Sequence, residues 1–182
     1  MWYVMQVRVG TEERIAQQCN TRIPESILKR NFIPYSEAKF KFHGEWTTLK
    51  RRIFLGYVFL DTDHIEEVLK YLYKMPDMTK VLGVGNEIVP LTEEEVDFLL
   101  QLGGEEQIVR LSKLMLDGTK VTVLNGPLKG KEGLIKKINK HKRRITLETD
   151  LFDRLQQIEV GFEFAVERTE HEKKAELTAQ SA

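Results

Sequence analysis

Residues 120–133 decide the fold, and they read Lys-Val-Thr-Val-Leu-Asn-Gly-Pro-Leu-Lys-Gly-Lys-Glu-Gly. Val121 and Val123 alternate with polar neighbours, which predicts a strand with one buried face. The Asn-Gly-Pro sequence at 125–127 ends that strand, because glycine adopts positive φ and proline donates no backbone hydrogen bond. Gly130 and Gly133 bracket a second turn before the apolar pattern resumes. These residues predict a compact strand–turn–strand unit.

The same stretch resembles the KOW motif, a signature of small SH3-like β-barrels in transcription elongation factors and some ribosomal proteins. The Val-x-Val strand, the Gly-Pro turn and both later glycines stand at that family's spacing. The alternative is an unrelated small barrel with a Gly-Pro hairpin. The resemblance implies a five-stranded barrel over residues 117–167.

The length and composition of the chain limit the possible number of domains and the class of protein. The 182 residues are enough for one large domain or two small ones, and their 41% hydrophobic share can form a core. No apolar run approaches the roughly 20 residues that a membrane-spanning helix needs. A single cysteine, Cys19, argues against an internal disulfide and against a zinc site built from cysteines. We expect a cytosolic protein that binds no membrane.

A net charge of zero hides one strongly basic segment. Residues 120–145 contain nine lysines and arginines but a single acid, Glu132. Such a segment attracts polyanions. A solvated lysine-rich loop would explain one charge run, but a cluster spread over two strands and their turn favours nucleic acid. The candidate binding residues are Lys129, Lys131, Lys136, Lys137, Lys140, His141, Lys142, Arg143 and Arg144.

The first half of the chain begins with a strand and a helix. Residues 2–9 carry a strand pattern, and Thr11 can cap the helix that follows. Ile15, Cys19 and Ile23 form one apolar stripe at helical spacing. Cys19 is therefore predicted to be a core residue rather than a nucleophile, since no base is placed to activate it.

Two further helices are predicted from capping patterns. Asp63 with Glu66, and Thr92 with Glu95, each have the spacing of a capping box, and helical apolar patterns follow both pairs. Alternation over residues 32–42 predicts a strand that turns at His43-Gly44. The apolar run at 51–60 predicts a long central strand.

The order β-α-β-β-α-β-α indicates an α+β sandwich. Four segments resemble the NGN domain of NusG-type transcription factors: Trp2-Tyr3-Val4, Gly10-Thr11-Glu12, Phe54-Leu55-Gly56-Tyr57-Val58 and Val89-Pro90-Leu91-Thr92. The NGN resemblance implies an antiparallel sheet flanked by helices. The whole resemblance, KOW included, covers residues 1 to about 167. It predicts an NGN domain at 1–103, a linker at 104–116, a KOW barrel at 117–167 and a disordered tail at 168–182. We expect the two domains to move independently, although Ile108, Leu111 and Met115 have helical spacing and could dock the linker on a neighbour.

The resemblance also implies partners. NusG-type proteins bind the clamp helices of the largest RNA polymerase subunit through the NGN domain. The matching residues here are Phe54 and Tyr57, with Trp2 near them. Aromatic side chains suit an interface because they bury a large area at low rotamer cost. An ordinary core role is the alternative, since a regular strand would point Phe54 and Tyr57 to opposite faces.

Catalytic chemistry finds little support. The glycine pair at 83–85 lacks the third glycine and helix start of a dinucleotide site, and the four histidines are scattered. We expect a monomeric protein that is not an enzyme, with no catalytic residue, metal or cofactor.

Two departures from the usual family pattern are informative. The chain has Phe54-Leu55-Gly56-Tyr57 in place of Phe-Pro-Gly-Tyr, and Phe152-Asp153-Arg154 in place of Phe-Gly-Arg. Together with the unusually basic barrel, they indicate a specialised paralogue. The sub-family that it resembles most is LoaP, an operon-specific antiterminator whose KOW domain binds an RNA hairpin. A housekeeping NusG whose barrel binds proteins, and a KOW protein that binds RNA away from polymerase, remain the alternatives.

Overall fold

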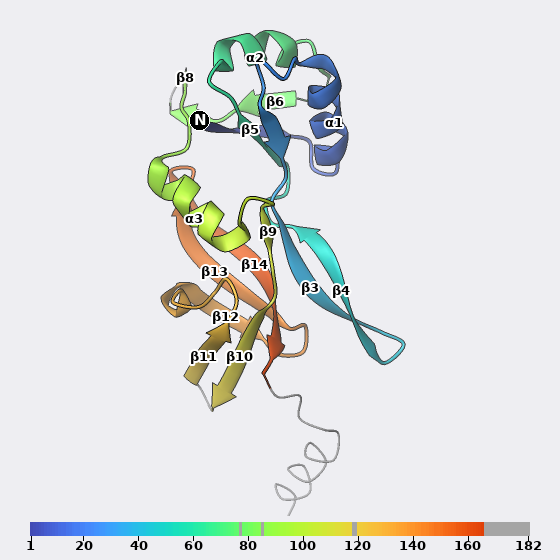
Figure 1. Ribbon diagram of the computed structural model, residues 1–182, viewed down its shortest axis with the longest axis vertical. Coiled ribbons are helices and arrows are strands. Elements are labelled where there is room, and N and C mark those ends of the chain that lie inside the picture. Colours follow the sequence, from blue (N-terminus) through green and yellow to red (C-terminus); the bar gives the residue numbers. More distant parts are fainter. Residues whose placement is uncertain (77, 85, 118–119, 166–182) are drawn as a thin grey trace, which may run out of the picture.

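The computed structural model describes residues 1–76, 78–84, 86–117 and 120–165. Its N-terminal part is built on an antiparallel sheet with the strand order β2-β5-β1-β6. The strands are β1 (Trp2–Val7), β2 (Arg30–Phe32), β5 (Tyr57–Asp61) and β6 (Met78–Val81). Helices α1 (Glu12–Arg22) and α2 (Ile65–Leu72) lie together at the same end of the molecule (Figure 1).

Both faces of β1 are buried. Tyr3 and Met5 pack in a core with Ile15 and Cys19 of α1 and with residues of α2. Trp2 and Val4 point to the other face and join a second core. Burial raises the pKa of the Cys19 thiol to about 11, which agrees with the predicted core role.

Two short segments extend from this sheet. Strands β3 (Tyr35–Phe42) and β4 (Glu45–Arg52) form the predicted hairpin, with His43 and Gly44 at positive φ in its turn. Strands β7 (Gly83–Val84) and β8 (Glu87–Ile88) form a separate ribbon. The β3–β4 hairpin projects from the sheet and runs beside the C-terminal strands (Figure 1).

Helix α3 (Glu93–Gly103) begins with the predicted capping box, in which Thr92 and Glu95 exchange hydrogen bonds. The box predicted at Asp63 is wrong, because α2 begins after His64 and has no side-chain cap. Asp63 instead binds Lys29, and that contact lowers the Asp63 pKa to about 2. Among the described residues, no helix is long and apolar enough to cross a membrane.

The C-terminal part is a five-stranded barrel sheet with the order β11-β10-β14-β13-β12. Its elements are β10 (Ser112–Asp117), β11 (Lys120–Asn125), the 3-10 turn η1 (Glu132–Leu134), β12 (Ile135–Asn139), β13 (Arg144–Leu151) and β14 (Arg154–Phe164). β10 therefore starts inside the segment expected to be a linker. The same segment contains β9 (Ile108–Val109), which pairs in parallel with β3. Helical spacing at 108–115 was misleading, because both ends of the segment find a strand to pair with.

The expectation of independent domains is wrong, because one apolar core runs through both. It joins Trp2, Val4 and Phe59 of the sheet, through Leu102 of α3, to the barrel interior around Phe162. Helix α3 lies between the sheet and the barrel (Figure 1). The physical reason is that α1 and α2 cover only one face of the sheet, so the second face needs other apolar cover. Residues 168–182, predicted to be a disordered tail, lie outside the described residues.

Candidate functional site

A backbone bend gathers the aromatic residues of the NGN motif on one side of the sheet. The predicted strand at 51–60 is broken: β4 ends at Arg52, β5 starts at Tyr57, and Gly56 between them has φ +78°. Positive φ is readily available to glycine. In a regular strand, Phe54 and Tyr57 would point to opposite faces of the sheet. Because the chain bends at Gly56, both side chains contact the same neighbour.

The carboxylate of Glu12 holds this bend. It is fully buried and accepts hydrogen bonds from the backbone N–H groups of Gly56 and Gly10, each at 2.7 Å. Arg52 lies 3.4 Å from the same carboxylate and balances its charge. A buried charge is tolerated only with such partners. Glu12 is therefore a positioning residue for the aromatic side chains.

The neighbour that Phe54 and Tyr57 share is the tip of the β13–β14 hairpin. We call residues 151–154 the barrel tip. Phe152 and Asp153 have φ of +60° and +57°, the arrangement of a two-residue hairpin turn. Asp153 thus occupies the left-handed conformation that the usual glycine would take.

The Phe152 ring inserts into an aromatic cluster, which we define as Phe54, Tyr57 and Phe59. Its centroid lies 5.4 Å from Phe54, 5.8 Å from Tyr57 and 5.9 Å from Phe59. These separations are typical of favourable aromatic pairs. The aromatic cluster is therefore covered by the barrel.

Polar contacts surround the inserted ring. The backbone N–H of Phe152 donates to Glu95 Oε1 at 2.6 Å, and the Arg154 guanidinium donates to the Tyr57 hydroxyl. Trp2 lies deeper, edge-on to Phe32 at 4.8 Å and 7% exposed. Of the three residues predicted to face polymerase, Trp2 and Phe54 are buried and Tyr57 is half-buried under the barrel tip.

The predicted basic surface is only partly assembled. The pairing of Asn139 with Arg144 confirms that the strands carrying the basic residues are adjacent. We call residues 140–142 the basic turn; Lys140, His141 and Lys142 are all exposed there. Lys137 is exposed on the neighbouring strand, whereas Lys129 is exposed in a separate turn.

The other predicted basic residues have protein partners. Lys136 binds Glu148 at 2.8 Å, a hydrogen bond that lowers the Glu148 pKa, and Lys131 donates to Gln101 of α3. Arg143 is buried, with its guanidinium carbon 4.0 Å from the Trp46 ring centroid. Arg144 lies over Phe40 and 3.4 Å from Glu159. In this arrangement both arginines hold the β3–β4 hairpin to the barrel and are not open for RNA.

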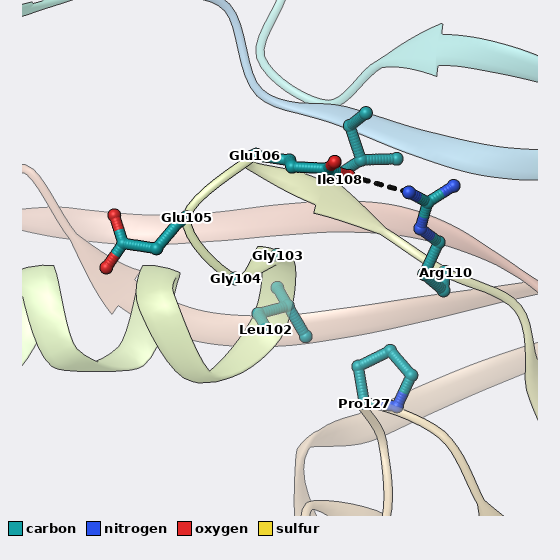
Figure 2. Close-up of a pocket in the computed structure, with 8 residues that line it drawn as sticks. All are labelled: Leu102, Gly103, Gly104, Glu105, Glu106, Ile108, Arg110 and Pro127. Atoms are coloured by element: carbon teal, nitrogen blue, oxygen red, sulfur yellow. Dashed lines mark hydrogen bonds and ion pairs between the residues drawn. The ribbon is translucent and has the colours of Figure 1, made fainter.

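One hollow of about 310 Å³ lies at the seam between the domains. It is bounded by the end of α3, by β9 and by Pro127 of the barrel, and Glu106 and Arg110 bind each other at its edge (Figure 2). These residues offer no nucleophile with an adjacent base. Within the described ranges, no group of three or more His, Cys, Asp or Glu residues could hold a metal.

Sequence reasoning missed several residues that define the site. Glu12 stood in a quoted motif, but its distant partner Gly56 gave no local signal. Phe152 was noted only as part of the Phe152-Asp153-Arg154 segment, whose departure from the usual pattern is Asp153, and not as a contact. Trp46 lies in a polar strand, and only its closeness to Arg143 reveals its role.

Comparison with known proteins places this geometry in context. The family model described as transcription termination factor nusG matches residues 1–100, more than half of the chain. The chain belongs to the NusG family. A model of the KOW motif also matches, over residues 118–148. The resemblance to NusG proteins is thereby confirmed, and the finer resemblance to LoaP stays a prediction.

Relatives cover nearly the full length of this NusG-family chain. It is 24% identical over 174 residues to the transcription termination/antitermination protein NusG of Thermus thermophilus, covering 88% of this chain and 95% of that protein. It is 26% identical over 170 residues to the Staphylococcus aureus protein of the same name, covering 89% and 92%.

A solved structure described as domain interaction in Thermotoga maritima NusG has the same fold. Its TM-score is 0.58 at 20% identity, over 88% of this chain and 92% of that one. The α+β fold with NGN and KOW domains is thus confirmed.

Proposed function

We propose that this NusG-family chain is an operon-specific antitermination factor of the LoaP type. It binds RNA polymerase through the NGN domain and an RNA hairpin through the KOW barrel. The observation that carries the proposal is the combination of an aromatic cluster on one domain, covered by the barrel tip, with an exposed basic turn on the other. The protein acts by binding, as a cytoplasmic monomer, and needs no cofactor or catalytic residue.

Polymerase docking uses the aromatic cluster. Phe54 and Tyr57 each contact the Phe152 ring, and aromatic side chains are typical anchors of protein interfaces. Phe152 fills the position that a polymerase side chain would take. The clamp helices therefore compete with the barrel tip, and docking requires the tip to leave.

RNA binding uses the basic turn together with Lys137. Lys137, Lys140 and Lys142 are exposed and make no ion pair among the described residues, so they are open to phosphate. Phosphate contacts of this kind supply affinity that falls with salt, with a log–log slope of roughly −0.7 to −0.9 per phosphate neutralised. An RNA hairpin offers phosphates from both strands of its stem at close spacing.

The test compares two partners on one triple variant. Lys137→Ala/Lys140→Ala/Lys142→Ala should lose binding to a labelled RNA hairpin and keep wild-type affinity for RNA polymerase. A matched control removes three exposed cations remote from the turn: Arg22→Ala/Lys70→Ala/Lys74→Ala. Intact hairpin binding by the first variant would overturn the RNA assignment. A wild-type protein without hairpin affinity would favour a housekeeping NusG whose barrel binds proteins.

A further inference from the structure

The β3–β4 hairpin of the N-terminal domain contacts the barrel next to the basic turn. The contact that joins them is Arg143, which follows the basic turn directly and stacks on Trp46 at 4.0 Å. Trp46 pairs across the hairpin with Lys41, so their side chains share one face. Exposed lysines from two domains therefore flank this stack: Lys41 pairs with Trp46, and Lys142 precedes Arg143.

Several independent contacts hold β3 of the hairpin against β14 of the barrel. Ser36 Oγ donates to the Glu159 backbone oxygen at 3.2 Å, and Lys39 Nζ lies 3.6 Å from Glu163. Gly161 of β14 passes so close to β3 that a Cβ on it would lie 2.2 Å from the Glu37 backbone oxygen. Only glycine permits this approach, so position 161 is a sensitive point of the contact.

The far end of the β3–β4 hairpin has the chemistry of a nucleic-acid contact. Phe42 is 68% exposed and stands edge-on to His43 at 4.2 Å. Lys41 and Lys50 are exposed and make no ion pair among the described residues, whereas Arg51 and Arg52 are paired with Glu159 and with Glu12 and Glu13. An exposed aromatic pair beside unpaired lysines suits an unpaired base with its phosphates.

We infer that residues 41–43 form the second half of the RNA-binding surface. This inference rests on the proposed function and adds a partner surface from the NGN domain. Lys140 and Lys142 contact stem phosphates, Lys41 contacts a loop phosphate, and Phe42 with His43 stacks on an unpaired loop base. RNA with an unpaired loop is thus preferred over a plain duplex, because only the loop offers an exposed base face.

Because the two halves meet only while the domains are packed, RNA binding favours the packed arrangement. Polymerase docking favours release of the barrel tip. RNA and polymerase therefore shift the equilibrium between packed and separated domains in opposite directions. By linkage, binding of either ligand lowers the affinity of the protein for the other.

The experiment uses the full chain and two labelled RNAs, a stem closed by an unpaired purine loop and the same stem as a blunt duplex. Lys41→Ala/Phe42→Ser should weaken stem–loop binding by roughly 5- to 100-fold, as expected for the loss of one stacked base. Duplex binding should change far less. The matched control at the C-terminal end of α2, Lys70→Ala/Tyr73→Ser, likewise removes one exposed lysine and one exposed aromatic side chain, and it should change the binding of neither RNA.

Two further variants distinguish failure of this inference from failure of the proposed function. Lys140→Ala/Lys142→Ala should weaken binding to both RNAs. Gly161→Ala keeps every lysine, but it should lower the affinity for the stem–loop RNA toward the value measured for Lys41→Ala/Phe42→Ser. Its far-UV circular dichroism spectrum should be unchanged. Wild-type affinity in Lys41→Ala/Phe42→Ser, with affinity lost in Lys140→Ala/Lys142→Ala, would overturn this inference alone. Absence of RNA binding by the wild type would overturn the proposed function together with it.

Discussion

Phe152→Gly should open the protein and strengthen its binding to RNA polymerase. Glycine suits the turn, because position 152 has φ +60°, and relief of backbone strain there applies equally to the packed and separated domains. The change therefore acts on the interface. It removes a half-buried phenyl ring that contacts the three rings of the aromatic cluster.

The magnitude follows from those contacts. Burial of a full phenyl ring contributes about 1.5–3 kcal/mol, and each aromatic pair adds about 0.5–1.5 kcal/mol without full additivity. A half-buried ring with three partners stabilises the packed arrangement by roughly 2–4 kcal/mol. The separated fraction should rise by about 30- to 1,000-fold, and polymerase affinity should rise with it until that fraction reaches one.

The assay is a fluorescence titration of labelled full-length protein with purified polymerase. Leu155→Ser is the control, since Leu155 is 60% exposed on the same β-hairpin and lies outside the aromatic contacts. NMR of Phe152→Gly should also show amide shifts at Phe54 and Tyr57. Unchanged polymerase affinity in a variant whose NMR spectrum shows separated domains would refute the competition between barrel tip and polymerase.

Two other predictions concern stability. Glu12→Gln keeps the shape of the side chain but turns one hydrogen-bond acceptor into a donor that faces a backbone N–H. The free energy of unfolding in urea should therefore fall by about 1–3 kcal/mol relative to the exposed control Glu25→Gln. Equal stability of the two variants would show that Glu12 does not hold the Gly56 bend. Asp63→Asn removes a carboxylate whose folded pKa, about 2, lies below its unfolded value near 3.8, chiefly through Lys29. Its contribution is present above the unfolded pKa and is lost as the pH falls through about 2, so the melting temperature of the variant should lie below wild type at pH 7 and meet it near pH 2. A difference that persists at pH 2 would contradict this assignment.

The features that were predicted correctly from the sequence depend on interactions between residues close together in the chain. The Thr92–Glu95 box, the His43-Gly44 turn and the Cys19 stripe depend on residues a few positions apart, and all were confirmed. Asp63 has the same local pattern as Thr92, but Lys29 lies far away in sequence and takes its carboxylate. A capping pattern alone cannot show such a competitor.

The site was harder to predict because its partners come from different domains. Arg143 and Arg144 look like nucleic-acid contacts in a basic run, yet Trp46 and Phe40 of the β3–β4 hairpin hold them. No role was predicted for Phe152, which fills the aromatic cluster. Domain packing determines these roles, and no spacing within either domain encodes it.

The most direct test of the account is a spin-label distance between the domains with and without polymerase. Labels at Tyr73→Cys, directly after α2, and at Leu124→Cys on β11 occupy exposed positions, while the native Cys19 is buried. We predict one narrow distance distribution for the free protein and a shift to longer, broader distances when polymerase binds. A distribution that stays narrow and unshifted on saturating polymerase would contradict the claim that polymerase docks on the surface that Phe152 covers.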